Sequence, residues 1–454
     1  MSQLLEERIG EWRAWLLRRA ALQTRDVDEL EDHLRGQVSA LGQAGLDEDE
    51  AFLVAVKRLG DLDSLSREYA REYSERLWKQ LVMAPRADEG SPGAGRDAAV
   101  AVGLAVAAAV AIKVPELFGR PLPGADDTYL SFYSRNLSLF VLPLLAAYFA
   151  WKRWLDATLR PWAALPFVAG ALIVNLLPFA PEGYTEVLAV LHLPIALWLG
   201  VGFAYAGGAW RDHAHRMNFL RFSGEWFIYY ALIAFGGGVL TAFTAFVFRA
   251  IGMDVEYLLG SWVVPCGAVG AVLIAAWLVE AKQSVIENMA PVLTRLFTPL
   301  FVLLLLSFLV TMVWTGSAID VEREVLIGFD LLLALVLGLV LYAISARDPV
   351  APPGAFDALQ LVLVGAALIV DVLALWAIAA RISSFGFSPN KVAALGENVI
   401  LLVNLAGAAW LYARFLKGRA PFAALERWQT AYLPVYALWA WLVVALFPVI
   451  FGYR

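Results

Sequence analysis

The chain has 454 residues, of which 60% are hydrophobic and 17% charged, and its formal net charge at pH 7 is −6. This mild negative charge does not favour nucleic-acid binding. Cys266 is the only cysteine, so an intrachain disulfide framework is excluded.

The charged residues are distributed unevenly along the chain. Residues 1–96 hold 33 charged residues, whereas the remaining 358 residues hold 43. Such a shift in composition marks a domain boundary. We expect a soluble helical domain over residues 1–82, a linker rich in Pro, Gly and charge over residues 83–96, and a membrane domain over residues 97–454.

The N-terminal domain has the apolar spacings of a small four-helix bundle. Apolar residues recur three and four positions apart, which is typical of helices that pack against one another. The third helix has an N-cap at Asp47, a carboxylate three residues later at Glu50, and Gly60 as its stop. The apolar positions of the first three helices include Leu5, Ile9, Leu34, Val38, Leu41 and Ala55.

The membrane domain contains eleven apolar segments, most near the length of about 20 residues that crosses a hydrocarbon core. Their approximate limits are 98–118, 133–151, 162–180, 186–208, 224–248, 257–279, 297–315, 325–345, 358–380, 392–415 and 431–451. The pattern predicts an all-α protein, a polytopic transmembrane helix bundle of about eleven spans with a small N-terminal cytoplasmic helical domain.

The orientation of the bundle follows from the first residues and from the basic residues between segments. The stretch MSQLLEERIGEWRAWLLRR lacks the uninterrupted apolar region of a secretory signal, so we expect a cytoplasmic N-terminus. Thirteen Lys and Arg residues then fall in the inner loops, and seven in the outer loops and the C-terminus. This bias, with an odd number of spans, predicts a C-terminus outside.

Residues 26–69, DVDELEDHLRGQVSALGQAGLDEDEAFLVAVKRLGDLDSLSREY, resemble the bacterial permease prefix domain, also described as a HAAS-type helical domain. The shared pattern is an acidic helix with ELEDHLR, a Gly-Leu turn and a capped helix with EAFLVAVKRLG. The resemblance implies a regulatory or interaction module, with a cytoplasmic protein partner for residues 1–82.

The membrane domain is similar to a family of uncharacterised multi-pass bacterial membrane proteins. Its most distinctive stretch is ARISSFGFSPNKVAALGEN, residues 380–398, with weaker support from VEAKQSVIENMAPVLTRLFTPL. The resemblance implies a many-helix fold in a bacterial inner (cytoplasmic) membrane. It implies no reaction, substrate or catalytic residue.

Ionisable residues inside the apolar segments are candidates for function, since insertion costs about 2.5–3.5 kcal/mol near the bilayer centre. Asp371 lies near the middle of segment 358–380. It either binds a cation or accepts a proton during transport, or it is a neutral group hydrogen-bonded to a neighbouring helix. Asp330, about one and a half turns inside segment 325–345, either borders an external vestibule or reaches interfacial water.

Three further ionisable residues lie in or beside the segments. His192 either titrates or is a core histidine with satisfied hydrogen bonds. Glu225 and Glu280 lie at cytoplasmic ends of their segments, where we expect surface ion pairs with Arg221 and Lys282.

Other polar residues within the segments have structural interpretations. Lys113 is expected to extend outward from the first segment, with Glu116 one turn away. Asn175, Asn398 and Asn404 are expected to form hydrogen bonds between helices.

Glycine and proline mark two candidate helix breaks. Gly236, Gly237 and Gly238 lie about midway along segment 224–248, and Pro265 and Gly267 lie in the next segment. Both helices are expected to bend there, and unwound backbone near the midplane is a feature of many transporter binding sites. The alternative is that these residues serve only close helix packing.

The stretch between the ninth and tenth segments predicts a helix start, with Ser388 as N-cap and Pro389 as the first helical residue. It is either a stiff outer turn or part of a basic site. In the second interpretation Arg381 and Lys391 bind an anionic group beside the helix N-terminus.

Motifs for catalysis and cofactor binding are scarce. The sequence contains no GxSxG, P-loop, HExxH or CxxC motif, and the histidines of DHAH at 212–215 are better explained as part of a basic loop. We therefore expect no cofactor and no catalytic residue. The leading hypothesis is a permease-like or channel-like protein that moves a small solute or ion under control of the N-terminal domain.

Two other hypotheses remain open at this stage. One is a membrane sensor or assembly protein whose N-terminal domain recruits a cytoplasmic partner, and the other is an intramembrane enzyme that acts on a lipid-linked substrate. The lipid bilayer is the expected partner in every case, and the sequence leaves oligomerisation open.

Overall fold

The computed structural model describes residues 94–122, 130–180, 183–281, 289–315 and 323–454, with a few residues of the N-terminal part. The chain divides into two compact units, Met1–Pro92 and Gly93–Arg454.

In the first unit the described residues are helical, and seven of them form a buried apolar cluster. The cluster consists of Leu5, Ile9, Leu34, Val38, Leu41, Ala51 and Ala55. All but Ala51 are among the apolar positions predicted from the spacing. The predicted fourth helix, residues 61–81, and the linker up to residue 93 lie outside the described residues, whereas residues 94–96 of the predicted linker are helical.

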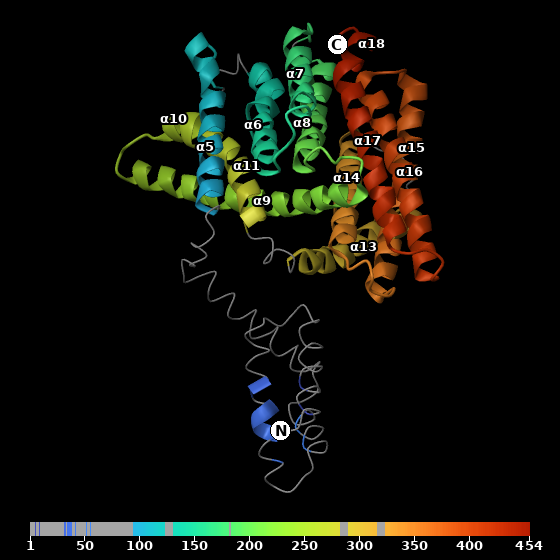
Figure 1. Ribbon diagram of the computed structural model, residues 1–454. Helices are drawn as coiled ribbons and strands as arrows, with labels where there is room; N and C mark the ends of the chain where they lie inside the picture. The colour runs from blue at the N-terminus through green and yellow to red at the C-terminus, as the bar shows by residue number, and fades with distance from the viewer. Residues whose placement is uncertain are drawn as a thin grey trace. The chain divides into compact units, whose positions relative to one another are not determined.

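The second unit is built from helices throughout the residues that the structure describes (Figure 1). The helices are α5 (Ala94–Lys113), η1 (Val114–Phe118), α6 (Leu130–Lys152), α7 (Arg160–Leu176), α8 (Tyr184–Tyr205), α9 (His213–Ala250), α10 (Glu256–Leu258), η2 (Leu259–Val263), α11 (Val264–Ala281), α13 (Met289–Thr315), α14 (Arg323–Ala346), α15 (Ala355–Phe385), α16 (Pro389–Leu416), α17 (Ala423–Ala445) and α18 (Phe447–Ile450).

Each of the eleven predicted apolar segments corresponds to a helix, which confirms the all-α helical bundle. Nine helices of the described residues have the length and hydropathy of a membrane span. Of the other two segments, α7 is only 17 residues long. The second, α17, begins with polar residues that include Glu426 and Arg427.

Helix α9 differs most from the prediction. It has 38 residues and begins at His213, well before the predicted limit of 224. Figure 1 shows it crossing α5, α6 and α8 at a steep angle, so it does not run alongside them as a parallel span would. A Cβ atom at Gly224 would overlap the ring of Tyr342, so glycine permits the close approach of α9 to α14.

Two apolar clusters hold the second unit together. One lies mainly among α5, α6, α8 and α11, where Tyr148 and Phe149 are fully buried. The other lies mainly among α13, α14, α15 and α16, where Tyr412 is fully buried. The contact between α8 and α16 joins the two halves. Most of the predicted ionisable residues lie around this contact.

Candidate functional site

Four ionisable side chains and one asparagine lie along α16 and on the helices that pack against it, α8, α14 and α15. His192 Nε2 lies 2.5 Å from Glu397 Oε1. Asn398 Nδ2 donates a hydrogen bond of 2.7 Å to Asp330 Oδ1. Asp330 is near enough to both Glu397 and Asp371 for their charges to interact. We call these five residues the carboxylate line.

The members of the carboxylate line lie at different depths. His192 is eight residues after the start of α8, and Glu397 is eight residues after the start of α16. Asp330 is seven residues after the start of α14. At 1.5 Å per residue these positions are about 10–12 Å from the helix starts. Asp371 precedes the end of α15 by 14 residues, or about 21 Å. Since α14 and α16 begin where α15 ends, the line descends from one end of the bundle toward its middle.

Asp371 is the deepest member of the line, and its side chain is isolated. It is fully buried, and neither carboxylate oxygen has a hydrogen-bond partner among the described residues. The predicted alternative of a carboxyl group hydrogen-bonded to a neighbouring helix is therefore not observed. An unpaired buried polar group costs about 1–3 kcal/mol, and a bare carboxylate costs far more. Asp371 is therefore the member of the line whose burial the described side chains compensate least.

His192 and Glu397 make a short side-chain contact between α8 and α16. His192 Nδ1 lies 2.8 Å from the carbonyl oxygen of Leu188, which can only accept, so this ring nitrogen is the donor. The other ring nitrogen, Nε2, lies 2.5 Å from Glu397 Oε1. The ring is therefore held between the backbone of its own helix and a carboxyl group of α16.

Glu397 was not among the residues predicted from the sequence. It lies near the start of its apolar segment, where a carboxylate is easily explained as an interfacial residue. The signal was its position directly before Asn398, two polar residues together inside a segment. Its side chain is 34% exposed, whereas that of His192 is 7% exposed, so Glu397 is the more accessible member of the pair.

The basic residues near the α15–α16 turn are placed apart from this line. Lys391 Nζ donates to the carbonyl oxygen of Gly386, 2.8 Å away, at the C-terminus of α15. Ser388 is the N-cap residue of α16 and Pro389 its first residue, although no side-chain capping bond forms. These contacts describe a stiff turn. An anion site at Arg381 and Lys391 stays a prediction.

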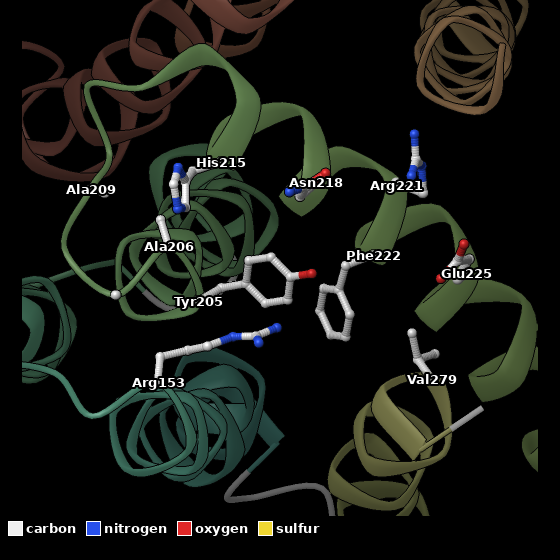
Figure 2. A pocket seen from close by; sticks show the side chains of 11 residues that line it. Arg153, Tyr205, Ala206, Ala209, His215, Asn218, Arg221, Phe222, Glu225 and Val279 are labelled. Carbon is white, nitrogen blue, oxygen red and sulfur yellow. The ribbon is translucent and has the colours of Figure 1, made fainter. Parts of the chain in front are cut away.

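The glutamates at the other end of the bundle have the following neighbours. Glu280 accepts hydrogen bonds of 2.9 and 3.0 Å from Arg153 and lies 3.5 Å from Lys152. Its predicted partner, Lys282, lies outside the described residues. Glu225 lines a cavity together with Arg221 (Figure 2).

The predicted hydrogen bonds between helices are confirmed. The side chains of Asn136 and Asn175 bond to one another at 2.8 and 3.1 Å and join α6 to α7. Asn398 reaches Asp330 on α14, and Asn404 Nδ2 donates to Gln429 Oε1 of α17 at 2.9 Å.

Lys113 makes two contacts near the C-terminal end of α5. Its side chain is 9% exposed and pairs with Glu116, as expected, but Nζ also donates to the carbonyl oxygen of Ser261 at 2.9 Å. Ser261 lies four residues before Pro265, which has no N–H to offer that carbonyl. The lysine therefore replaces the missing helix donor and is retained inside the bundle.

The two candidate helix breaks behave differently. The π-helical turn η2 ends directly before α11, so the irregular backbone lies just ahead of Pro265, and a Cβ at Gly267 would meet nothing within 4 Å. In contrast, α9 continues as an α-helix through Gly236, Gly237 and Gly238. A Cβ at any of these three would also meet nothing within 4 Å.

The fold and the buried ionisable residues define a polytopic membrane protein. No protein-family model, curated protein or solved structure matches the chain.

Proposed function

We propose that the membrane helices move a small solute or ion and that proton transfer along the carboxylate line is the coupled step. The observation that carries the proposal is Asp371, a fully buried carboxyl group without a hydrogen-bond partner among the described residues. Ionisable groups retained inside a membrane bundle are typical of proton relays and ion pathways.

The order of the residues supports a direction of transfer. His192 and Glu397 are in side-chain contact, and Glu397 is the more exposed partner. Asp330 accepts a hydrogen bond from Asn398. It interacts electrostatically with Glu397 of this pair and also with Asp371. A proton that moves from Glu397 to Asp330 and on to Asp371 neutralises each carboxylate in turn. Movement of the helices would then expose Asp371 to the other side.

The orientation in the membrane is part of the proposal. The distribution of basic residues supports a bacterial inner membrane location with a cytoplasmic N-terminus and an outer C-terminus. In that orientation the His192–Glu397 pair lies nearer the outside. The orientation is tested with two variants, Phe387→Cys and Lys417→Cys, each in a Cys266→Ala background. Each variant is labelled with a thiol reagent that does not cross the membrane. Phe387 should react in intact cells and Lys417 only after lysis.

The N-terminal unit is proposed to regulate the bundle. Its permease-prefix-like sequence supports a module that binds a cytoplasmic protein or the inner loops. Deletion of residues 1–82 should change the rate or the control of transport while the membrane helices still fold. Unchanged transport together with unchanged partner capture would contradict a regulatory role.

Proton movement by purified protein in liposomes is the decisive measurement. A pH-sensitive dye inside the liposomes reports proton entry after an imposed pH step. Asp371→Asn should reduce the protein-dependent rate at least about tenfold, since the amide cannot carry the proton. The matched control is Asp348→Asn, an exposed aspartate whose side chain accepts from the Val350 N–H at 3.0 Å.

Two outcomes would overturn the proposal. Asp371→Asn with the wild-type proton rate would remove Asp371 from the mechanism. A wild-type protein without proton or solute flux would favour the alternative, a membrane sensor or assembly protein whose N-terminal unit recruits a partner.

A further inference from the structure

A polar cavity of about 570 Å³ lies where α6, α8 and α11 end and α9 begins (Figure 2). Its volume is within the range of about 300–1,000 Å³ that is usual for small-molecule sites. The cavity is at the opposite end of the bundle from the His192–Glu397 pair, so it is separate from the carboxylate line. Its polar lining residues are Arg153, Tyr205, His215, Asn218, Arg221 and Glu225.

Arg153 is held in a defined position at one side of the cavity. Its Nη2 makes both hydrogen bonds to Glu280, whose side chain is only 2% exposed. The guanidinium also lies 5.0 Å from the ring centroid of Tyr205. Figure 2 shows the guanidinium and the Tyr205 hydroxyl directed toward the middle of the cavity. Arg153 is therefore a preorganised donor and not a freely moving surface side chain.

A second basic group, His215, lines the same side. Its Nδ1 lies 2.8 Å from Asp212 Oδ2, and Asp212 also accepts from the Ala214 backbone N–H at 3.0 Å as the N-cap of α9. These bonds hold the pKa of Asp212 below its ordinary value, so this carboxylate is ionised at neutral pH. It orients His215 with Nδ1 toward Asp212 and the other ring nitrogen, Nε2, directed away from it.

The acidic residue of the cavity lies away from Arg153. Figure 2 shows Glu225 beside Arg221, on the far side of Phe222. Arg221 is fixed there because its Nε and Nη2 donate to the Ser345 carbonyl oxygen at 2.9 and 2.5 Å. The cavity lining itself thus has three basic side chains and one carboxylate. Arg153 and His215 lie at one end of it, and each is oriented by a carboxylate outside the lining, Glu280 and Asp212 respectively.

We infer that this cavity binds a phosphate group, carried by the headgroup of a membrane phospholipid or by a small phosphorylated solute. The planar fork of arginine suits phosphate oxygens, and Tyr205 and Asn218 add neutral donors. Helices of membrane length end at this level, which is where phospholipid phosphates lie, and basic pockets between membrane helices are suited to such headgroups. The inference does not depend on transport.

Calorimetric titration of the full-length protein in detergent tests the inference with three soluble probes. These are dihexanoyl phosphatidylglycerol, inorganic phosphate and dihexanoylglycerol, which has the same chains and no phosphate. Tighter binding of the phospholipid than of inorganic phosphate identifies a lipid site, and the reverse order identifies a site for a phosphorylated solute. Binding of neither phosphate probe, or equal binding of dihexanoylglycerol, overturns the inference.

Variants then locate the site. Arg153→Gln should weaken binding about tenfold, the loss of one charge-assisted contact. The His215 side chain is 49% exposed, so its substitution leaves the core intact. His215→Gln should weaken phosphate binding about threefold. The matched control Arg427→Gln removes an exposed arginine that does not line the cavity and should bind as the wild type does. Unchanged binding in both cavity variants overturns the inference.

Discussion

His192 Nε2 and Glu397 Oε1 lie 2.5 Å apart and connect α8 to α16. The other ring nitrogen of His192 lies 2.8 Å from the Leu188 carbonyl oxygen, which fixes the orientation of the ring. The contact connects two helices whose apolar residues belong mainly to different clusters. This side-chain pair is therefore one of the contacts between the two halves of the bundle.

The first prediction concerns the energetic coupling of this pair. His192→Gln and Glu397→Gln should each destabilise the protein, and the double variant should be less destabilised than the sum of the two. A coupling free energy of about 1 kcal/mol is expected for a hydrogen-bonded pair of this kind. Thermal unfolding of the full-length protein in detergent measures it. Additive effects would show that the two side chains do not interact in solution.

The second prediction separates stability from function at Asp371. Asp371→Val replaces a buried group without hydrogen bonds by an apolar one, so the protein should unfold at a temperature equal to or higher than that of the wild type. Proton movement should be lost in the same variant. This combination is typical of a residue retained for function at a cost in stability. A loss of more than about 2 kcal/mol would instead indicate a structural partner for Asp371.

The sequence located much of the carboxylate line but not its connections. Asp371, Asp330 and His192 are recognisable because each interrupts an apolar segment, and the length of the segment gives their depth. A single sequence does not say which helices adjoin, so the partnership of His192 with Glu397 could not be found. Similarly, the apolar segment 224–248 predicts a helix there, but not its start at His213 or its close approach to Tyr342 of α14 at Gly224.

The third prediction concerns the lysine that replaces a helix donor. Lys113→Met leaves the Ser261 carbonyl without its donor and Glu116 without its partner, and should destabilise the protein by about 2–3 kcal/mol. Pro265→Ala adds a backbone N–H four residues after Ser261, and this N–H donates to the same carbonyl once the π-helical turn takes an α-helical register, so the cost of Lys113→Met should be smaller in that background. Unfolding of the four proteins in detergent measures the difference.

A lysine at the surface provides the control for this cycle. Lys417 is exposed, and Lys417→Met should change stability by less than about 0.5 kcal/mol. An equal cost of Lys113→Met in both backgrounds would show that its bond to Ser261 contributes nothing to stability.

The last prediction tests the packing of α16 against α17. A Cβ atom at Gly407 would overlap the ring of Trp428, whose Nε1 donates to the Asn404 carbonyl oxygen at 3.0 Å. The ring is rigid, so α17 must move away to admit the methyl group, and the Trp428 hydrogen bond must lengthen. Gly407→Ala should therefore destabilise the protein by about 2 kcal/mol, the usual cost of overpacking.

Gly365→Ala is the matched substitution, since a Cβ there meets nothing within 4 Å. It should change stability by less than about 0.5 kcal/mol, because the added methyl group meets no neighbour. Chemical unfolding of both variants in the same detergent compares them directly. Equal stability of the Gly407→Ala and Gly365→Ala proteins would contradict the prediction. It would mean that the Trp428 ring does not pack against α16 at Gly407.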